Sequence, residues 1–467
     1  MSMEWMAPAM FGGLVIVLLM GYPVAFSLAA NGLLFAAIGM KLGFFDMSLM
    51  QALPERVLGI MANQTLLAIP FFTFMGLILE RSGMAEELLD SVGQLFGAIR
   101  GGLAYAVIFV GALLAATTGV VAASVIAMGL ISLPIMVRYG YDTRLATGVI
   151  AASGTLAQII PPSLVLIVLA DQLGVSVGDL YRGALVPSLV LTGFYVLFVF
   201  MVTLIKPAAA PALPLSARTL CGWALWRSAT LSIMRPLLLI FLVLGTIFLC
   251  WATPTEGGAM GATGALMLAW IKRRLPLDML KQAMDTTTRL SSFVLFILIG
   301  STVFSLVFRG VNGDLWVEHL LTGLPGGALG FLIVVNLLVF VLAFFLDFFE
   351  IAFIIIPLLA PVAQKLGIDL VWFGVLIGIN MQTSFMHPPF GFALFYLRSV
   401  APREIKTTDI YRGAIPFVLI QLAMVVLVIA FPSITGGVSQ QTLSKGVIEV
   451  PMDEDSYGDY YLPKEWR

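Results

Sequence analysis

Apolar runs long enough to cross a lipid bilayer recur through this chain, from Met6 to Pro432. A helix needs about 20 mostly apolar residues to span the hydrocarbon core. The composition agrees, because 60% of the 467 residues are hydrophobic and only 11% are charged, whereas a soluble domain is about 25% charged. The chain is therefore expected to be an all-α protein that crosses the membrane many times, with membrane lipid as its main surroundings.

The charge and the cysteines exclude other classes of protein. The net charge is -1, so no basic field favours nucleic acid binding. Cys221 and Cys250 lack the spacing of a metal site or a disulfide framework. No cofactor and no metal other than a coupling ion are expected.

The apolar runs form two sets with the same order. Each set begins with a run too long for one span that is interrupted near its middle (5–39 at Gly21-Tyr22-Pro23, 236–271 at TPTEGG). Each set also has single-length runs, a further double-length run with polar residues at its middle, and one run broken at a Pro-Pro pair. This pattern predicts about ten spans and two re-entrant hairpins. The predicted units are a first repeat (1–205, with a hairpin at 101–137 and a broken helix at 145–170), a cytoplasmic linker (206–235), a second repeat (236–432, with a hairpin at 325–364 and a broken helix at 371–397) and a polar acidic tail (433–467).

The repeat is also visible residue by residue. GVIAASGTLAQIIPPSLVLIVL (148–169) resembles GVLIGINMQTSFMHPPFGFALF (374–395), and DLYRGA (179–184) resembles DIYRGA (409–414). With five crossings in each repeat, one side of the membrane holds 17 of the 25 Lys and Arg residues. The basic side is expected to be cytoplasmic, which makes the repeats inverted and places both termini in the periplasm. Inverted repeats are typical of alternating-access carriers.

Four breaks at membrane depth are the candidate functional sites. Non-helical backbone persists there only where protein, ions or water satisfy its polar groups. Two breaks are hairpin tips, at 117–119 and 347–350, and two are broken helices, around 154–163 and 380–391. Free carbonyls with hydroxyls and a carboxylate suit sodium, and half-helix N-termini favour an anion. The sequence therefore predicts an ion-coupled anion carrier.

The candidate residues follow from these breaks. The sodium ligands predicted in the first repeat are Thr117, Thr118, Gly119, Ser153, Gly154 and Pro161. Those predicted in the second repeat are Asp347, Gln382, Thr383, Ser384 and Pro388. The predicted substrate-binding residues are Ser163, Glu350, Asn380 and His387.

The motifs TPTEGGAMGA, IIPPSLVLIVLADQLGVSVGDLYRGALVP, FFLDFFEIAFIIIPLLAP and NMQTSFMHPPFGFALFYL carry a resemblance over nearly the whole chain. They resemble the large permease subunit of tripartite ATP-independent periplasmic (TRAP) transporters, in the branch named for mannitol and chloroaromatic compounds. The resemblance implies a scaffold with an elevator-type transport domain, sodium coupling, and residence in the bacterial inner membrane. It also implies a small four-span permease subunit and a periplasmic binding protein that delivers an organic carboxylate.

Structural interpretations stand beside the functional ones. Thr117 and Thr118 are alternatively hydroxyls that bond to carbonyls of their own helix. A helix cap or an interhelical hydrogen bond in the scaffold is the favoured interpretation of Glu256, and a packed, hydrogen-bonded histidine is the favoured interpretation of His387. At the level of function, a stand-alone ion-coupled anion symporter or proton antiporter is the alternative. An intramembrane enzyme is not expected, because the sequence has two histidines and neither HExxH nor GxSxG.

Overall fold

The computed structural model describes residues 5–218, 222–344, 346–389 and 391–436. This part of the chain consists of helices and their connections, which confirms the all-α prediction. The acidic tail from residue 437 onward lies outside it. The helices of the first half are α1 (Met6–Leu19), α2 (Val24–Lys41), α3 (Ser48–Gln51), α4 (Leu53–Met61), α5 (Ala68–Arg81), α6 (Met84–Phe96), α7 (Gly102–Thr118), α8 (Val121–Arg138), α9 (Thr143–Thr155), η2 (Leu156–Gln158), α10 (Leu164–Leu173) and α11 (Val177–Ile205).

The second half follows two short turns, η3 (Pro207–Ala209) and η4 (Leu215–Ala217). Its helices are α12 (Gly222–Ile240), η5 (Phe241–Gly245), α13 (Thr246–Phe248), α14 (Pro254–Ile271), α15 (Leu277–Gly310), α16 (Gly313–Thr322), α17 (Gly327–Leu342), α18 (Phe348–Glu350), η6 (Ile351–Ile355), α19 (Ile356–Lys365), α20 (Leu370–Ser384), α21 (Phe392–Val400), α22 (Thr407–Ala430) and η7 (Pro432–Thr435). The segment predicted as a linker therefore includes the first turns of α12.

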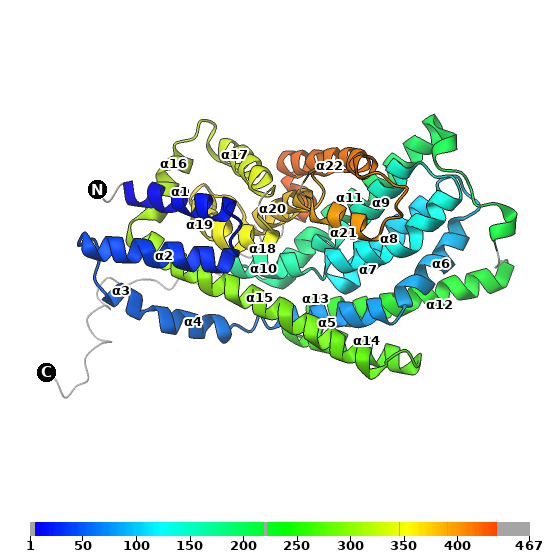
Figure 1. Ribbon diagram of the computed structural model, residues 1–467, viewed down its shortest axis with the longest axis horizontal. Coiled ribbons are helices and arrows are strands. Elements are labelled where there is room, and N and C mark those ends of the chain that lie inside the picture. Colours follow the sequence, from blue (N-terminus) through cyan, green and yellow to red (C-terminus); the bar gives the residue numbers. More distant parts are fainter. Residues whose placement is uncertain (1–4, 219–221, 345, 390, 437–467) are drawn as a thin grey trace, which may run out of the picture.

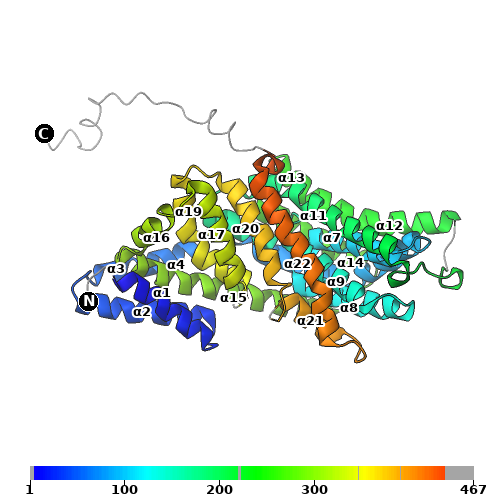
Figure 2. The ribbon, with the colours of Figure 1, turned by 90° about the horizontal axis from the view of Figure 1, so that it is seen from above.

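Two layers are visible in the structure. The long helices α2, α15, α5, α14 and α12 run lengthwise in one layer, where α2 packs on α15 and α5 packs on α14 (Figure 1). The shorter elements α7 to α10 and α17 to α21 lie on this layer together with α11 and α22. Seen from above, α22 crosses this second layer diagonally (Figure 2).

Seven helices of the described residues are long and apolar enough to cross a membrane, or eight if the bent pair α16 and α17 counts as one span. The chain is therefore a multi-pass membrane protein, while the count of ten spans stays a prediction. The apolar run at 57–79 is divided between α4 and α5. The side chain of Asn63 causes the break, because its Oδ1 accepts hydrogen bonds from the backbone N–H groups of Thr65 (2.9 Å) and Leu66 (3.4 Å). Such local bonds compete with helix continuation.

The TPTEGG segment begins α14. The Thr253 hydroxyl accepts from the Glu256 N–H at 3.3 Å, and the Glu256 carboxylate accepts from the Thr253 N–H at 2.7 Å. This reciprocal arrangement is a capping box, which satisfies two backbone donors at a helix start. The favoured interpretation of Glu256 as a cap is therefore confirmed.

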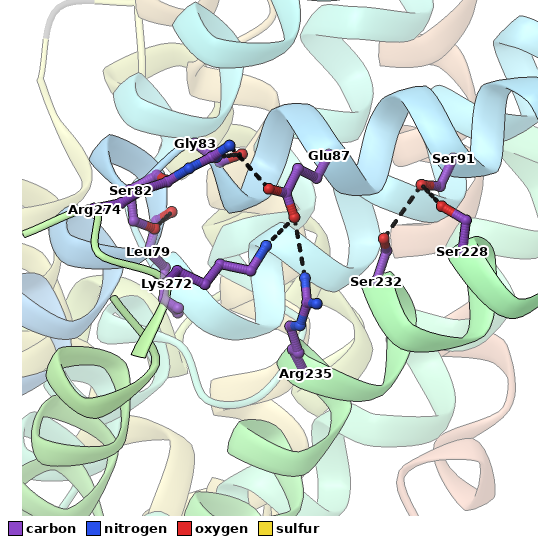
Figure 3. Close-up of polar contacts among 10 residues, drawn as sticks. All are labelled: Leu79, Ser82, Gly83, Glu87, Ser91, Ser228, Ser232, Arg235, Lys272 and Arg274. Carbon is purple, nitrogen blue, oxygen red and sulfur yellow. Dashed lines mark hydrogen bonds and ion pairs between the residues drawn. The ribbon is translucent and has the colours of Figure 1, made fainter. Parts of the chain in front are cut away.

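Helix α6 connects the two layers and is fixed by one carboxylate. Glu87 accepts hydrogen bonds from Arg235 of α12 at 3.0 Å and from Lys272, and it pairs with Arg274 at 3.0 Å (Figure 3). One turn further along, the Ser91 hydroxyl lies 3.2 Å from those of Ser228 and Ser232. Partial burial acts to raise the pKa of Glu87, but the hydrogen bond from Lys272 and the surrounding cations outweigh it and hold the pKa below its ordinary value.

Replacement of Glu87 by glutamine is expected to lower the free energy of unfolding by about 1–2 kcal/mol, since three partly exposed ion pairs are lost together. A carboxylate with a lowered pKa stabilises the fold above its ordinary pKa, and this contribution disappears as the pH falls through the lowered value. The difference in melting temperature between wild type and Glu87→Gln should therefore be largest at neutral pH and vanish in acid. Glu86→Gln, which changes an exposed neighbour outside the ion pairs, is the control. An equal loss in both variants would contradict the assignment.

Candidate functional site

The first helix break lies between η2 and α10. The chain leaves the helix after Gln158, passes the cis Pro161-Pro162 bond and begins α10 after Ser163. The buried Ser163 hydroxyl donates to the Gln158 carbonyl at 2.5 Å and accepts from the Leu166 N–H at 3.4 Å. Both functions of this hydroxyl are therefore used in the break itself, which favours a capping role over the predicted contact with substrate.

The second helix break has the same form. Helix α20 ends at Ser384, the Pro388-Pro389 bond is cis, and α21 begins after Gly391. The Gly391 N–H donates to the His387 carbonyl at 2.8 Å. In the last turn of α20, Thr383 and Ser384 donate their hydroxyl hydrogens to the carbonyls of Asn380 (2.7 Å) and Met381 (2.5 Å). This leaves the oxygen lone pairs of both hydroxyls free to accept.

The two breaks meet across the repeats. The Gln382 amide donates to the Thr155 carbonyl at 3.1 Å and so joins the end of α20 to the end of α9. Gln421 of α22 donates to the Thr155 hydroxyl at 3.4 Å and to the Tyr195 hydroxyl at 2.9 Å. All four side chains are fully buried. The centre of the second layer is therefore a polar crossing to which both repeats contribute.

Buried polar atoms without a hydrogen-bond partner occur along the helices that form this crossing. Such atoms are rare in folded proteins and mark places that water, ions or ligands fill. Among the described residues, those on or beside the two discontinuous helices are Ser153 Oγ, both amide atoms of Gln158, Asn380 Oδ1, Gln382 Oε1, both ring nitrogens of His387, and Gln421 Oε1. The oxygens of this set are the kind of ligand that sodium takes, and the amide groups suit a carboxylate.

The tip of the first hairpin lies against the first break. Gly119 has a left-handed φ of +61°, and a Cβ there would lie 3.4 Å from Leu164 Cγ and 3.7 Å from the Pro162 carbonyl. Thr117 points elsewhere. Its hydroxyl donates to the Leu114 carbonyl at 3.0 Å, and its side chain lines a small cavity against α5, α6 and α12. The structure thus shows the alternative interpretation of Thr117, in which its hydroxyl bonds to a carbonyl of its own helix. The side chain of Thr118 lies outside the described part.

Ser153 and Gly154 of α9 face different helices of the first hairpin. A Cβ on Gly111 of α7 would lie 2.5 Å from Ser153 Cβ, and a Cβ on Gly154 would lie 2.3 Å from Val125 Cγ2 of α8. The absent side chains let α7 and α8 approach α9 closely. The structure therefore does not gather the predicted ligands of the first repeat at one point. Ser153 keeps an unpartnered hydroxyl, whereas Gly154 serves helix packing.

The tip of the second hairpin carries both predicted carboxylates. Asp347 precedes α18 and accepts from the Phe348 N–H at 2.6 Å, while Glu350 accepts from the Asp347 N–H at 3.0 Å. Together they form a capping box, and negative charge is favourable at a helix start. The adjacent Phe348 ring lies 6.2 Å from the Phe385 ring in the second break. The tip and the break of the second repeat are therefore neighbours, as predicted.

His387 is packed between aromatic rings. Its ring stacks on Phe344 with centroids 4.2 Å apart and meets the edge of Phe340 at 4.7 Å. The residue is 3% exposed, and neither nitrogen has a hydrogen-bond partner among the residues that the structure describes. The packed histidine that the sequence favoured is observed, without the hydrogen bond expected with it. Its two nitrogens remain available to a ligand that enters the break.

Sequence reasoning missed Thr155, Gln421, Tyr195 and Asn336. The amide of Asn380 donates to the Asn336 carbonyl at 2.7 Å and to its Oδ1 at 3.0 Å, so Asn336 fixes a predicted site residue. Two signals were available. Asn336 and Gln421 are uncharged polar residues deep in apolar runs, where polar groups are costly. Thr155 stands six residues before the first proline of its pair, as Gln382 does in the other repeat.

Known proteins resemble this chain along most of its length. The family model of the DctM component of tripartite ATP-independent periplasmic transporters matches residues 11–434. The C4-dicarboxylate TRAP transporter large permease protein DctM of Pseudomonas aeruginosa is 31% identical over 80% of this chain and 86% of its own length. The protein of the same name from Rhodobacter capsulatus is 30% identical over 91% of this chain and 97% of its own length. The crystal structure of the YdaH transporter from Alcanivorax borkumensis shares the fold, with a TM-score of 0.57 at 16% identity over 82% of this chain and 89% of that one.

Proposed function

This chain belongs to the DctM family of tripartite ATP-independent periplasmic transporters, and from that premise we propose that it moves an organic carboxylate across the bacterial inner membrane with sodium as the coupling ion. Its relatives are transport permeases, so the chain is a transporter rather than an enzyme. The carboxylate class agrees with the C4-dicarboxylate named for the two relatives. In this proposal, the periplasmic binding protein that delivers the solute selects which carboxylate is transported.

One observation carries this proposal. The amides of Gln382 and Gln421 both donate to Thr155, where the discontinuous helices of the two repeats meet, and within the described residues the Oε1 atom of each amide has no hydrogen-bond partner. Sodium replaces its hydration shell with neutral oxygens, and an anion beside it is held by its charge and by amide donors. Ion and carboxylate would then stabilise each other in one low-dielectric site. Asp347 adds negative charge at the neighbouring hairpin tip, where it strengthens the binding of the cation.

The layers support an elevator-type movement. The polar crossing is built from α9, α20, α11 and α22, which lie together in the second layer. Helices α6 and α16 link this layer to the long helices, which it also contacts directly where α5 packs on α7. Glu87 ties α6 to α12 of the long-helix layer, whereas the Glu318–Lys365 pair ties α16 to α19 of the hairpin. We propose that the second layer moves as a transport domain while α2, α5, α12, α14 and α15 form the scaffold, with both termini in the periplasm.

Two partners belong to this proposal, namely a small four-span permease subunit and a periplasmic binding protein. Exposed apolar side chains on α12 and α14, such as Trp223, Trp226 and Trp270, give the scaffold a face suited to a membrane subunit or to lipid. A binding protein confers selectivity before the solute reaches the crossing, which agrees with the small number of charged groups there.

Uptake into proteoliposomes that contain the chain with both partners is expected to require an inward sodium gradient. A tenfold gradient supports about tenfold accumulation of solute for each coupled ion. Radiolabelled carboxylate uptake is compared between sodium and potassium outside, with potassium inside in both cases. Equal accumulation in the two media would contradict sodium coupling. Accumulation of free solute without the binding protein would instead favour a stand-alone symporter.

A further inference from the structure

Another cavity lies away from the crossing, at the end of α9 that carries Arg144. It has a volume of about 310 Å³ and lies between the start of α9, the end of α11 and the start of α22. Its wall is apolar, with Phe198, Val202, Ile205 and Pro416 among its side chains, and its rim carries charged residues. Ile205 is 72% exposed, so the cavity lies beside exposed apolar surface.

The charges at the rim are not balanced. Arg144, Lys206 and Arg412 line the cavity. Asp409 pairs with Arg144 at 3.1 Å, and the Asp142 carboxylate caps α9 by accepting from the Arg144 N–H at 2.8 Å. Within the described part of the chain, Lys206 and Arg412 take part in no ion pair, and both are exposed. Two cationic side chains without an ion-pair partner therefore lie at the rim of a cavity whose wall is apolar.

The repeat shows why Arg412 is free. Its counterpart in the DxYRGA motif, Arg182, lies 3.6 Å from Asp179 of the same motif and donates to the Phe248 carbonyl at 2.7 Å. In the second repeat the equivalent acid, Asp409, is turned to Arg144 of α9 instead. The motif thus pairs Arg182 with its own aspartate in the first repeat, whereas in the second repeat Arg412 is left without an ion pair.

We propose that this cavity, defined by Phe198, Val202, Lys206, Arg412 and Pro416, binds an anionic phospholipid. The phosphate lies between Lys206 and Arg412, and one acyl chain runs over Phe198, Val202 and Pro416. Basic pockets between helices on the cytoplasmic side recognise anionic headgroups, and the apolar wall below fits a lipid rather than a soluble anion. The bound lipid contacts α9, α11 and α22 together and so links the two repeats. This inference does not depend on the solute or on sodium.

The test uses the purified full-length chain in neutral detergent and follows its melting temperature. Phosphatidylglycerol is expected to raise the melting temperature of wild type, whereas phosphatidylcholine and inorganic phosphate leave it unchanged. The double variant Lys206→Gln with Arg412→Gln is expected to weaken the apparent affinity for phosphatidylglycerol by about 10- to 30-fold. Arg403→Gln, an exposed cation outside the cavity, keeps the wild-type response.

A second variant protects the test against a folding defect. Val202→Trp fills the floor of the cavity and keeps both cations, and it should also lose the response to phosphatidylglycerol. An unchanged response in the double variant would overturn the proposal, as would equal stabilisation by phosphatidylcholine. A response to inorganic phosphate alone, of the same size as that to phosphatidylglycerol, would show a soluble anion site and overturn the lipid assignment.

Discussion

Replacement of Gly413 by alanine is expected to abolish most transport and to destabilise the protein by about 1–3 kcal/mol. Gly413 lies where α22 crosses α9, and a Cβ there would stand 2.2 Å from the Arg144 carbonyl oxygen. On the facing helix, a Cβ at Gly148 would stand 2.2 Å from the Gly413 carbonyl oxygen. The obstacle is backbone on both sides, so the helices must separate by about 1 Å to reach an ordinary contact. Because α9 ends at the polar crossing, this displacement reaches Thr155.

The repeat supplies the matched control. Gly183 holds the same place in the DxYRGA motif of α11, but the atoms nearest to a Cβ there belong to side chains, Val371 Cγ1 at 3.0 Å and Val375 Cγ2 at 3.4 Å, and the one backbone neighbour, the Thr435 carbonyl oxygen, lies at an ordinary 3.5 Å. Gly183→Ala is therefore expected to be mild, and Gly193→Ala, whose Cβ would meet nothing within 4 Å, neutral. Melting temperature and solute uptake are measured for all three variants. Equal effects at Gly183 and Gly413 would contradict the close crossing.

The large features were predictable because they rest on lengths and repeats. Spanning runs follow from the thickness of the bilayer, and the Pro-Pro pairs remove backbone donors wherever they stand. The breaks at 159–163 and 385–391 and the tips at Gly119 and Asp347 therefore lie within or beside the predicted positions. The cap at Glu256 was also predictable from a short segment, because a threonine followed three residues later by a glutamate is a sequence signature of a helix start.

Side-chain directions could not be predicted in the same way. Thr117 and Gly119 are neighbours in sequence, yet the helix turns one toward α12 and the other toward the break. Gln382 was assigned to an ion site within its own repeat, but it reaches across to Thr155 of the other. Such choices depend on how the repeats dock, and docking depends on close approaches like that of Gly148 and Gly413. A hydropathy pattern predicts which segments span the membrane, but it does not predict where those helices cross one another.

Substitutions of Asp347 distinguish a structural role from a functional role more clearly than substitutions of the other candidate residues. Its carboxylate caps α18 and lies beside the second break, so both helix capping and ion binding explain its presence. Asparagine caps a helix about as well as aspartate does. Asp347→Asn therefore keeps the hydrogen bond to the Phe348 N–H and removes only the charge, whereas Asp347→Ala removes both.

Asp347→Asn is thus expected to leave the melting temperature near that of wild type while the sodium concentration for half-maximal uptake rises by at least about tenfold, or about 1.4 kcal/mol. Asp347→Ala should show the same loss together with lower stability, of about 1 kcal/mol. Glu350→Gln preserves the capping box, because glutamine fills its third position as well as glutamate does. If sodium dependence fails in Glu350→Gln and survives in Asp347→Asn, the ion is bound by Glu350. If it survives in both, the carboxylates of this tip serve helix α18 alone, and the coupling ion is held by the neutral oxygens at the crossing.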